Sequence, residues 1–301
     1  MNILITGASG YLGSQLTKRL VGDGHKVTLL LREASSLARL STCSDECIIE
    51  RFNDLSEVRK IIKRVEPEVI VHTACLYGRN GERLYELLEA NLMFGIAIID
   101  AITELGLLGK FINTDTCLSS DLNEYTLSKS QFTSWGHAKS QSFMGGLTFI
   151  NVSLQQFYGA GDDVSKLPNF ILQKCFDNSA DIELTDGTQL RDFIYIDDVV
   201  EAYSKLILNI ADLQGFVQVE LGSGISVPVR QFIEMIHLES ESTCKLNFGS
   251  IKPRLGEPRE CIAAPKFLYE LGWEPTYSLI EGIKLMVKIE RKLMSFQRTF
   301  I

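Results

Sequence analysis

A tyrosine and a lysine four positions apart are the residues of this sequence best suited to acid–base chemistry. Tyr125 and Lys129 belong to a stretch that the sequence pattern predicts to be helical. Positions i and i+4 of a helix lie on one face, one turn apart. A nearby ammonium group favours the phenolate and lowers the pKa of a tyrosine from its usual value of about 10. Tyr125 could therefore exchange a proton at a carbonyl or carbinol carbon, although the same spacing also occurs in ordinary surface pairs.

A second chemical signal is the G-x-x-G-x-x-G spacing of Gly7, Gly10 and Gly13. The apolar run 3–5 before it predicts a short buried strand, and the apolar spacing of residues 14–20 predicts a helix after it. Glycines at such a turn let the backbone approach a pyrophosphate, which then meets free N–H groups and the positive end of the helix dipole. The turn therefore predicts a dinucleotide site. It also contains Ser9, Tyr11 and Leu12.

The end of the second predicted strand bears on the choice of dinucleotide. Sites for NAD usually have an acidic residue there, which holds the ribose 2′-hydroxyl. This chain has Arg32, followed by Ser35 and Ser36. A guanidinium and two hydroxyls suit a 2′-phosphate, which favours NADP(H). The alternative is that Arg32 is a solvated loop residue and that the cofactor is NAD(H).

Alternating strands and helices must position these groups. We expect strands at 26–31, 47–50, 69–72, 111–114 and 148–154. We also expect a helix from 53 to 65 and a long amphipathic helix within 81–105 that carries Asn91. Elements that alternate at this pace indicate parallel βαβ units with right-handed crossovers, in which ligands bind at the carboxyl ends of the strands. The predicted class is α/β, with a doubly wound parallel sheet of the Rossmann type.

Composition and charge argue against several other classes of protein. The chain has 301 residues, of which 45% are apolar and 23% charged, as in ordinary globular proteins. Its net charge of −8 argues against a nucleic-acid partner. No stretch approaches the roughly 20 apolar residues of a membrane span, and Met1 and Asn2 lead directly into the first strand without a signal peptide. Seven cysteines without a C-x-x-C pair indicate free thiols in a reducing cytoplasm and no metal site.

Several motifs together resemble the extended short-chain dehydrogenase/reductases, a family of nucleotide-sugar epimerases, dehydratases and ketoreductases. The resemblance covers nearly the whole chain. It implies a Rossmann domain of residues 1–160, to which 187–215 return, and a smaller C-terminal α/β lobe of 161–186 and 216–301 that binds the nucleotide sugar. The landmarks are residues 7–13, 54–55, 71–74, 91, 111–116, 125 with 129, 157–161, 191–198, 254–257 and 271–275.

The resemblance also implies roles for particular residues. Tyr125 is the catalytic acid/base, and Lys129 is its partner and holds the nicotinamide ribose. The active-site hydroxyl of the family lies five residues beyond a strand phenylalanine, which from Phe111 gives Thr116, with Thr114 as the competing register. The implied cofactor-binding residues are Gly7, Ser9, Gly10, Tyr11, Leu12, Gly13, Arg32, Asp54, Leu55, Thr73, Ala74, Asn91, Tyr125, Lys129 and Gln155. Asp54 could accept from the adenine amino group or could simply cap a helix.

The implied substrate is a nucleotide sugar, and most of its ligands are expected in the C-terminal lobe. Arg191 and Arg254 match the diphosphate-binding arginines of the family, and Glu257 matches an acidic residue that contacts the nucleoside. The full set of implied substrate-binding residues is Tyr77, Thr116, Gln156, Arg191, Arg254 and Glu257. The family also implies a homodimer, built from the helices near 82–105 and 122–145.

Departures from the family pattern narrow the reaction. Only eight residues separate Thr116 from Tyr125, which shortens the sugar pocket on that side. The 4,6-dehydratases have an Asp-Glu pair directly after the active-site threonine, whereas Cys117 and Leu118 follow Thr116 here, so dehydration is disfavoured. Residues 111–116, the short loop and residues 191–193 resemble the CDP-abequose synthase type of reductase.

The prediction is NADPH-dependent reduction of the 4-keto group of an NDP-4-keto-6-deoxyhexose, in deoxysugar biosynthesis. One alternative is an NAD-dependent NDP-sugar 4-epimerase, which oxidises and re-reduces the same carbon. Another is a non-catalytic dinucleotide-binding sensor or scaffold. Such proteins typically lack the tyrosine or the lysine, and this chain has both Tyr125 and Lys129.

Overall fold

The computed structural model describes residues 1–107, 109–142, 146–178, 181–253 and 256–299, and the chain divides into two units. This division differs from the expected domains, because the first unit ends at Leu154 and because residues 190–195 pair with strands of the second unit. The first unit consists of Met1–Leu154, Val200–Glu220 and Phe267–Gly272, and the second consists of Gln155–Val199, Leu221–Lys266 and Trp273–Ile301.

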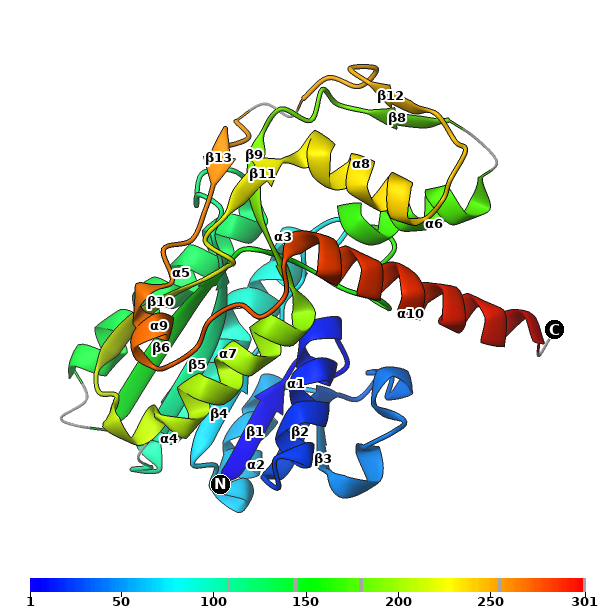
Figure 1. Ribbon diagram of the computed structural model, residues 1–301. Coiled ribbons are helices and arrows are strands. Elements are labelled where there is room, and N and C mark those ends of the chain that lie inside the picture. The colour runs from blue at the N-terminus through cyan, green and yellow to red at the C-terminus, as the bar shows by residue number, and fades with distance from the viewer. Residues whose placement is uncertain (108, 143–145, 179–180, 254–255, 300–301) are drawn as a thin grey trace. The chain divides into compact units, whose positions relative to one another are not determined.

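A seven-stranded sheet lies at the centre of the first unit (Figure 1), in the order β10-β6-β5-β4-β1-β2-β3. The neighbouring strands from β6 to β3 are parallel, which confirms the predicted doubly wound sheet. β5 extends beyond its predicted end, because Thr116 still pairs with Leu154 of β6. The strands are β1 (Asn2–Thr6), β2 (Lys26–Arg32), β3 (Ile48–Phe52), β4 (Val69–His72), β5 (Gly109–Thr116), β6 (Leu147–Leu154) and β10 (Phe216–Leu221).

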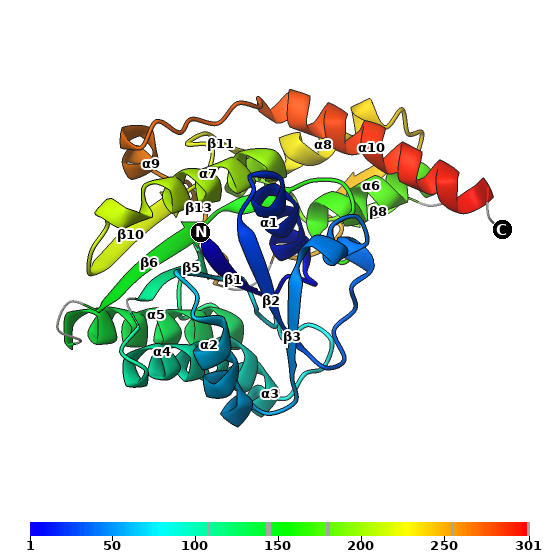
Figure 2. The same ribbon diagram turned by 90° about the horizontal axis from the view of Figure 1, so that it is seen from below.

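Helices cover both faces of this sheet. Figure 2 shows α2, α4 and α5 on one face and α1 and α7 on the other. The predicted long helix within 81–105 is interrupted by a π-turn, η4, that contains Asn91. The helical elements are α1 (Tyr11–Gly22), η1 (Ala38–Leu40), η2 (Ser44–Glu46), η3 (Leu55–Glu57), α2 (Val58–Val65), α3 (Leu84–Leu88), η4 (Glu89–Met93), α4 (Phe94–Glu104), α5 (Glu124–Ser142), α7 (Ile196–Leu208), η5 (Ile210–Asp212) and α9 (Lys266–Glu270).

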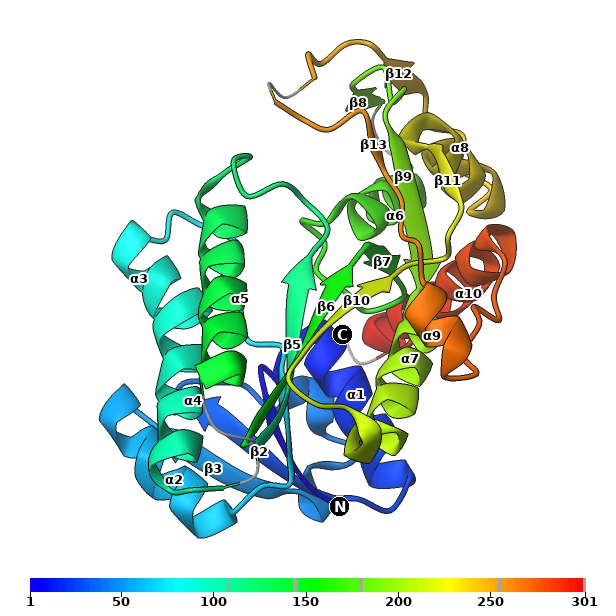
Figure 3. The ribbon, with the colours of Figure 1, turned by 90° about the vertical axis from the view of Figure 1, so that its left-hand side faces the viewer.

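Two glycines bring α5 close to its neighbours. A Cβ at Gly95 of α4 would lie 2.2 Å from the ring of Phe132, and a Cβ at Gly136 of α5 would lie 2.2 Å from the ring of Phe149. The Phe132 and Phe149 rings, which contact each other edge to face, are fully buried in the core beneath the sheet. Figure 3 shows α5 running beside α3 and α4. This close packing fixes the helix that carries Tyr125 and Lys129.

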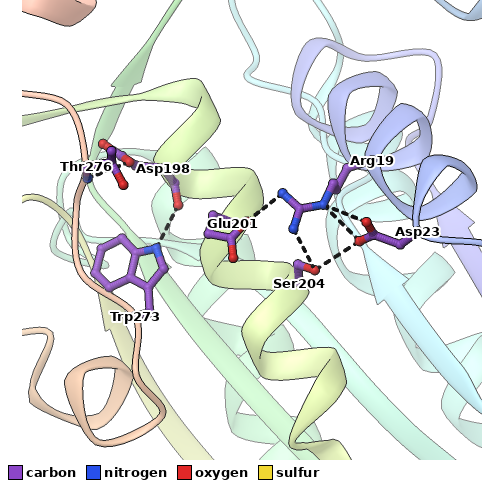
Figure 4. Close-up of polar contacts among 7 residues, drawn as sticks. All are labelled: Arg19, Asp23, Asp198, Glu201, Ser204, Trp273 and Thr276. Atoms are coloured by element: carbon purple, nitrogen blue, oxygen red, sulfur yellow. Dashed lines mark hydrogen bonds and ion pairs between the residues drawn. The ribbon is translucent and has the colours of Figure 1, made fainter.

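The other face of the sheet is tied together by Arg19 of α1. Its guanidinium lies 2.5 Å from Glu201 of α7 and 2.8 Å from Asp23, and it also donates to Ser204 (Figure 4). The carboxylates and the guanidinium are each about one-third exposed, so each pair contributes at most about 1 kcal/mol. The cluster orients α1 and α7 with respect to each other.

The second unit is built around β9 (Leu190–Tyr195). This strand pairs antiparallel with β11 (Ser226–Pro228) and parallel with both β13 (Glu260–Cys261) and β7 (Gln156–Tyr158). A separate parallel pair joins β8 (Ile182–Leu184) to β12 (Leu246–Phe248). The helices of this unit are α6 (Leu167–Asp177), α8 (Val229–Glu239) and α10 (Leu279–Thr299). The second unit therefore combines strands and helices, with bounds that differ from those of the expected C-terminal lobe.

Buried aspartates hold the loops of the second unit. Asp192 accepts hydrogen bonds from the backbone N–H groups of Ser223, Gly224 and Ala263. Asp198, at the start of α7, accepts from the backbone N–H of Thr276, and its carbonyl accepts from the indole of Trp273 (Figure 4). These bonds satisfy backbone donors that would otherwise lack partners in the interior.

The structure bears on the expected state of the cysteines and on the expected lack of a membrane span. All seven cysteines lie within the described residues and are free thiols, as predicted. Among the helices of the described part of the chain, none is both long and apolar enough to span a membrane.

Candidate active site

The glycine turn between β1 and α1 forms a cradle of bare backbone. Gly7 has a φ of +70°, and a Cβ there would lie 2.5 Å from the backbone nitrogen of Ala74. A Cβ on Gly13 would lie 2.3 Å from the carbonyl oxygen of Gly7. Gly10 precedes α1 and offers no side-chain cap, which leaves the amino end of that helix available to an anion. The turn has the close backbone approach that a dinucleotide pyrophosphate requires.

Thr73 and Ala74, two of the predicted cofactor residues, lie beside this turn. The Thr73 hydroxyl donates to the carbonyl of Thr6 at 2.8 Å, and the Ala74 N–H donates to the hydroxyl of Thr6 at 3.4 Å. The same Thr6 hydroxyl lies 2.8 Å from Nδ1 of His72, which is fully buried. These bonds hold the ends of β1 and β4 together, as the topology of a doubly wound sheet predicts.

The side chain of Asn91 is bonded within the protein, and its contact with a cofactor stays a prediction. Its side chain is fully buried; Oδ1 accepts from the Leu76 N–H at 2.7 Å, and Nδ2 donates to the Leu76 carbonyl and to the Ser128 hydroxyl. The amide thus joins the segment after β4 to α5 through the π-turn of η4. We interpret Asn91 as a residue that positions its neighbours, since its polar groups are already bonded within the protein.

Arg32, the last residue of β2, pairs with Glu89 at 3.0 Å and is about half exposed. A second arginine, which the sequence did not single out, lies beside it on β3. The guanidinium of Arg51 donates to the carbonyls of Glu33 at 2.6 Å and of Ser35 at 3.2 Å. Its position was foreseeable only from strand register, in which Arg51 is the partner of Leu31. Arg51 therefore shapes the segment that was predicted to bind a 2′-phosphate.

Asp54 caps the short helix η3. Its carboxylate accepts from the Ser56 N–H at 2.8 Å, while Glu57 accepts from the Asp54 N–H at 3.0 Å, which together form a capping box. The bond from Ser56 lowers the pKa of Asp54. The helix-cap alternative is therefore confirmed, and a contact with adenine stays a prediction. Leu55, the other predicted residue here, packs against the core.

Lys129 is buried on α5 without an acceptor for its ammonium group. Its side chain is 1% exposed, and its Nζ has no hydrogen-bond partner among the described residues. Burial, and then the charge of Lys129, hold the pKa of His72 well below its usual range. A buried ammonium without acceptors is costly. Ribose hydroxyls of a bound nucleotide would supply such acceptors, so Lys129 fits its predicted role.

Tyr125 lies at the beginning of α5, partly buried beneath the ring of Tyr77, whose centroid is 5.0 Å away. Burial raises the pKa of Tyr125 well above its usual value; Cys75, Asp115 and Cys117 add to this, while Arg79 opposes it. The expected fall of this pKa is therefore wrong for this structure, because desolvation of the phenolate outweighs the favourable charge of Arg79.

The two candidate threonines of β5 differ in their partners. The hydroxyl of Thr114 lies 2.6 Å from the phenolic oxygen of Tyr203 on α7. Thr116 lies at the carboxyl end of the strand, where its hydroxyl accepts only weakly, from the Leu118 N–H at 3.3 Å. The Thr116 N–H donates to the Asp115 carboxylate at 2.8 Å. This arrangement favours Thr116 as the hydroxyl available to a substrate.

The second unit holds the remaining predicted residues. Arg191, 5% exposed, donates to Glu257 at 2.7 Å and to the Leu190 carbonyl at 2.7 Å, so the structure brings two predicted substrate ligands together as an ion pair. Gln155 is buried, and its Oε1 has no partner among the described residues. Gln156 begins β7, opposite Phe193. Arg254 lies outside the described residues.

Comparisons with known proteins agree with this architecture. The model of the family described as "NAD dependent epimerase/dehydratase family" matches residues 3–222. A CDP-abequose synthase of Salmonella muenchen is 31% identical over 294 residues, which cover 96% of this chain and 97% of the relative. A UDP-glucose 4-epimerase of Yersinia enterocolitica is 25% identical, over 94% of this chain and 96% of the relative.

Solved structures have the same fold. The UDP-glucose 4-epimerase of Thermotoga maritima, solved with UDP-glucose, gives a TM-score of 0.85 at 21% identity over 98% of this chain and all of that chain. The UDP-glucose 4-epimerase of Thermus thermophilus, solved with NAD, gives 0.83 at 21% identity over 97% of this chain and 99% of that chain. At this identity the likeness concerns the fold.

Proposed function

This chain belongs to the NAD dependent epimerase/dehydratase family, and from that premise we propose that it reduces the 4-keto group of an NDP-4-keto-6-deoxyhexose with NADPH. The observation that carries the proposal is the placement of Tyr125 and Lys129 one turn apart on one face of α5, at the carboxyl edge of the sheet, because reduction of a ketone requires a proton donor. The similarity to CDP-abequose synthase over nearly the full length of both chains supports the same reaction class.

The residues of the first unit divide the work of this reaction. Tyr125 donates its proton to the carbonyl oxygen, and Thr116 donates a hydrogen bond to the same atom. Lys129 binds the nicotinamide ribose and stabilises the phenolate left on Tyr125. A bound nicotinamide supplies the hydride to the carbonyl carbon.

NADPH is favoured over NADH by the arginines near the end of β2. The Arg32–Glu89 pair is half exposed and contributes at most about 1 kcal/mol. A 2′-phosphate carries more charge and offers bidentate geometry, so it can displace Glu89 from Arg32. Arg51 supports this arrangement by holding the carbonyls of Glu33 and Ser35.

The nucleotide sugar is assigned to the second unit through Arg191. This buried guanidinium needs an anionic partner, which Glu257 supplies in the ligand-free protein. A diphosphate would compete with Glu257 for Arg191 and release the carboxylate toward the nucleoside. Gln156 and Tyr77 are further proposed contacts to the sugar, and Gln155 a contact to the cofactor.

A homodimer is proposed from the helices of the first unit. Large apolar side chains on α3, η4 and α5 are exposed: Leu84, Tyr85, Met93, Leu127 and Trp135. Side chains of this size on adjacent helices are typical of a surface that packs against another copy. The free thiols are consistent with action in a reducing cytoplasm.

The runner-up is an NDP-sugar 4-epimerase, since the curated relatives also include 4-epimerases. The two reactions differ in cofactor balance. A reductase consumes one NADPH per turnover, whereas an epimerase converts its substrate without net consumption.

The test is a panel of CDP-, dTDP-, GDP- and UDP-linked 4-keto-6-deoxyhexoses, followed by loss of NADPH absorbance. We expect stoichiometric consumption with at least one member, abolished in Tyr125→Phe but retained in Tyr203→Phe, which removes another buried phenol. Conversion of a 4-hydroxy sugar without consumption would support the epimerase instead. Cofactor binding without turnover across both sets would support a non-catalytic protein.

A further inference from the structure

Asp115 lies between Thr114 and Thr116 on β5 and has no role in the reaction as proposed above. Its Oδ1 accepts from the Thr116 N–H at 2.8 Å. Its Oδ2 accepts from the Thr133 hydroxyl at 2.7 Å and from the Asn151 amide at 3.1 Å. The carboxylate therefore touches the strand end that presents Thr116, the neighbouring strand β6 and helix α5.

The contact with Thr133 places Asp115 against the catalytic face of α5. Tyr125, Lys129 and Thr133 are spaced at i, i+4 and i+8, so they lie along one side of the helix. The hydrogen bond between Asp115 and Thr133 thus joins the strand carrying the hydroxyl residue to the helix face carrying the proton donor. Neither connection is visible in the local sequence.

A polar network holds the Asp115 carboxylate in this position. Asn151 donates to Asp115 and to Gln218, and it accepts from Asn113 at 2.8 Å. Asn113 and Asn151 are at most 2% exposed. Buried polar networks in which the members are bonded to one another define a single arrangement of their side chains.

The charged and titratable groups that act on Tyr125 come from several elements. The segment after β4 contributes Cys75 and Arg79, while β5 and the residue after it contribute Asp115 and Cys117. On α5 itself, Lys129 lies one turn away.

Asp115 is the carboxylate among these groups. Its like charge disfavours the phenolate and raises the pKa of Tyr125, whereas Arg79 lowers it.

We propose that Asp115 is a positioning residue of the reaction, which orients the backbone at Thr116 and, from this fixed position, acts through its charge on the proton donor Tyr125. This inference rests on the proposed function. Ketone reduction starts from the protonated phenol, and alcohol oxidation starts from the phenolate. Because the charge of Asp115 disfavours the phenolate, it biases the site toward reduction.

The decisive variant is Asp115→Asn, which keeps an acceptor for the Thr116 N–H and removes the charge. The rate of reduction follows the protonated fraction of Tyr125 and so falls as the pH rises through its pKa. Without the carboxylate this pKa is lower. We expect the alkaline limb of the kcat/KM profile to move toward lower pH. Asp115→Ser is a second neutral variant, with the same expected shift, should the asparagine impair folding.

Three controls separate charge from structure. Asp115→Glu keeps the charge and displaces the hydrogen bonds, so kcat should fall while the limb stays in place. Thr133→Val removes a partner of Asp115 but no charge, and should also leave the limb in place. Asp212→Asn removes a charge near Lys110, at the amino end of β5. It should change neither kcat nor the position of the alkaline limb. The proposal is overturned if the alkaline limb of the kcat/KM profile stays in place in Asp115→Asn and Asp115→Ser. It is also overturned if the limb moves by the same amount in Asp115→Glu.

A spectroscopic arm makes the result independent of the substrate. Tyrosinate absorbance is titrated with oxidised cofactor bound, and the Tyr125→Phe protein serves as the blank that isolates this one phenol. We expect the Tyr125 transition at lower pH in Asp115→Asn. If no ketosugar is reduced but the transition shifts, the proposed function fails and the effect of Asp115 on Tyr125 stands. If reduction occurs but neither limb nor transition shifts, the role of Asp115 fails alone.

Discussion

The hydroxyl of Thr114 lies 2.6 Å from the phenolic oxygen of Tyr203, so this threonine is bonded to helix α7. Thr116, two residues further along β5, has no comparable side-chain partner among the described residues; its hydroxyl accepts from the backbone of Leu118. Two threonines that are equivalent in a sequence motif thus differ in what their hydroxyls can do. Replacing each threonine by valine therefore tests which hydroxyl takes part in the reaction.

We expect Thr116→Val to lower kcat by about 10²-fold or more, because a hydrogen-bond donor to the developing oxyanion is lost. Thr114→Val should leave kcat within about threefold and lower the free energy of unfolding by about 1 kcal/mol, through the lost bond to Tyr203. Steady-state kinetics and urea denaturation measure the two effects. The opposite pattern would assign the active-site hydroxyl to Thr114.

The unpartnered ammonium of Lys129 predicts opposite effects on stability and on binding. In Lys129→Met a buried charge is replaced by an apolar chain of similar length, so the ligand-free protein should melt at a higher temperature. The same variant should bind NADPH at least about tenfold more weakly, since the ribose loses its charged donor. Calorimetry and cofactor titration measure both. Lys139→Met, at an exposed site on the same helix, should change neither; a less stable Lys129→Met protein would contradict the interpretation.

Arg32, supported by Arg51 near the end of β2, is predicted to select NADPH over NADH by binding the 2′-phosphate. Arg32→Ala should raise the KM for NADPH about tenfold and leave the KM for NADH nearly unchanged, because NADH lacks the 2′-phosphate. Arg51→Ala should have a smaller effect in the same direction, since it loosens the carbonyls of Glu33 and Ser35. Arg59→Ala, in an exposed pair with Glu104, is the matched control. Equal losses for both cofactors would show that these arginines do not select NADPH.

The buried His72 predicts a pH dependence of stability. Burial and Lys129 hold its pKa well below 6.5 in the folded protein, whereas the unfolded chain takes up a proton near pH 6.5. The unfolded state therefore binds more protons below that pH, and the free energy of unfolding should fall there by up to about 1.4 kcal/mol per pH unit. Urea midpoints between pH 7.5 and roughly 5 measure this slope. It should be shallower in His72→Gln and unchanged in His137→Gln.

The sequence by itself determined the parallel strands, the glycine turn and the one-turn spacing of Tyr125 and Lys129. These features follow from local periodicity and from which side chains share a helix face, so they do not depend on distant residues. It also identified Arg191 and Glu257, although not their ion pair.

Only the tertiary structure decided how these groups behave. The bonds of Thr114 to Tyr203, of Asp115 to Thr133 and of Arg51 to the carbonyls after β2 join residues from separate elements. The pKa of Tyr125 rises where its sequence spacing predicted a fall, because the burial that desolvates the phenol is produced by the packing of the whole unit. Long-range contacts and desolvation leave no local pattern in the chain, and here they set the chemistry of the site.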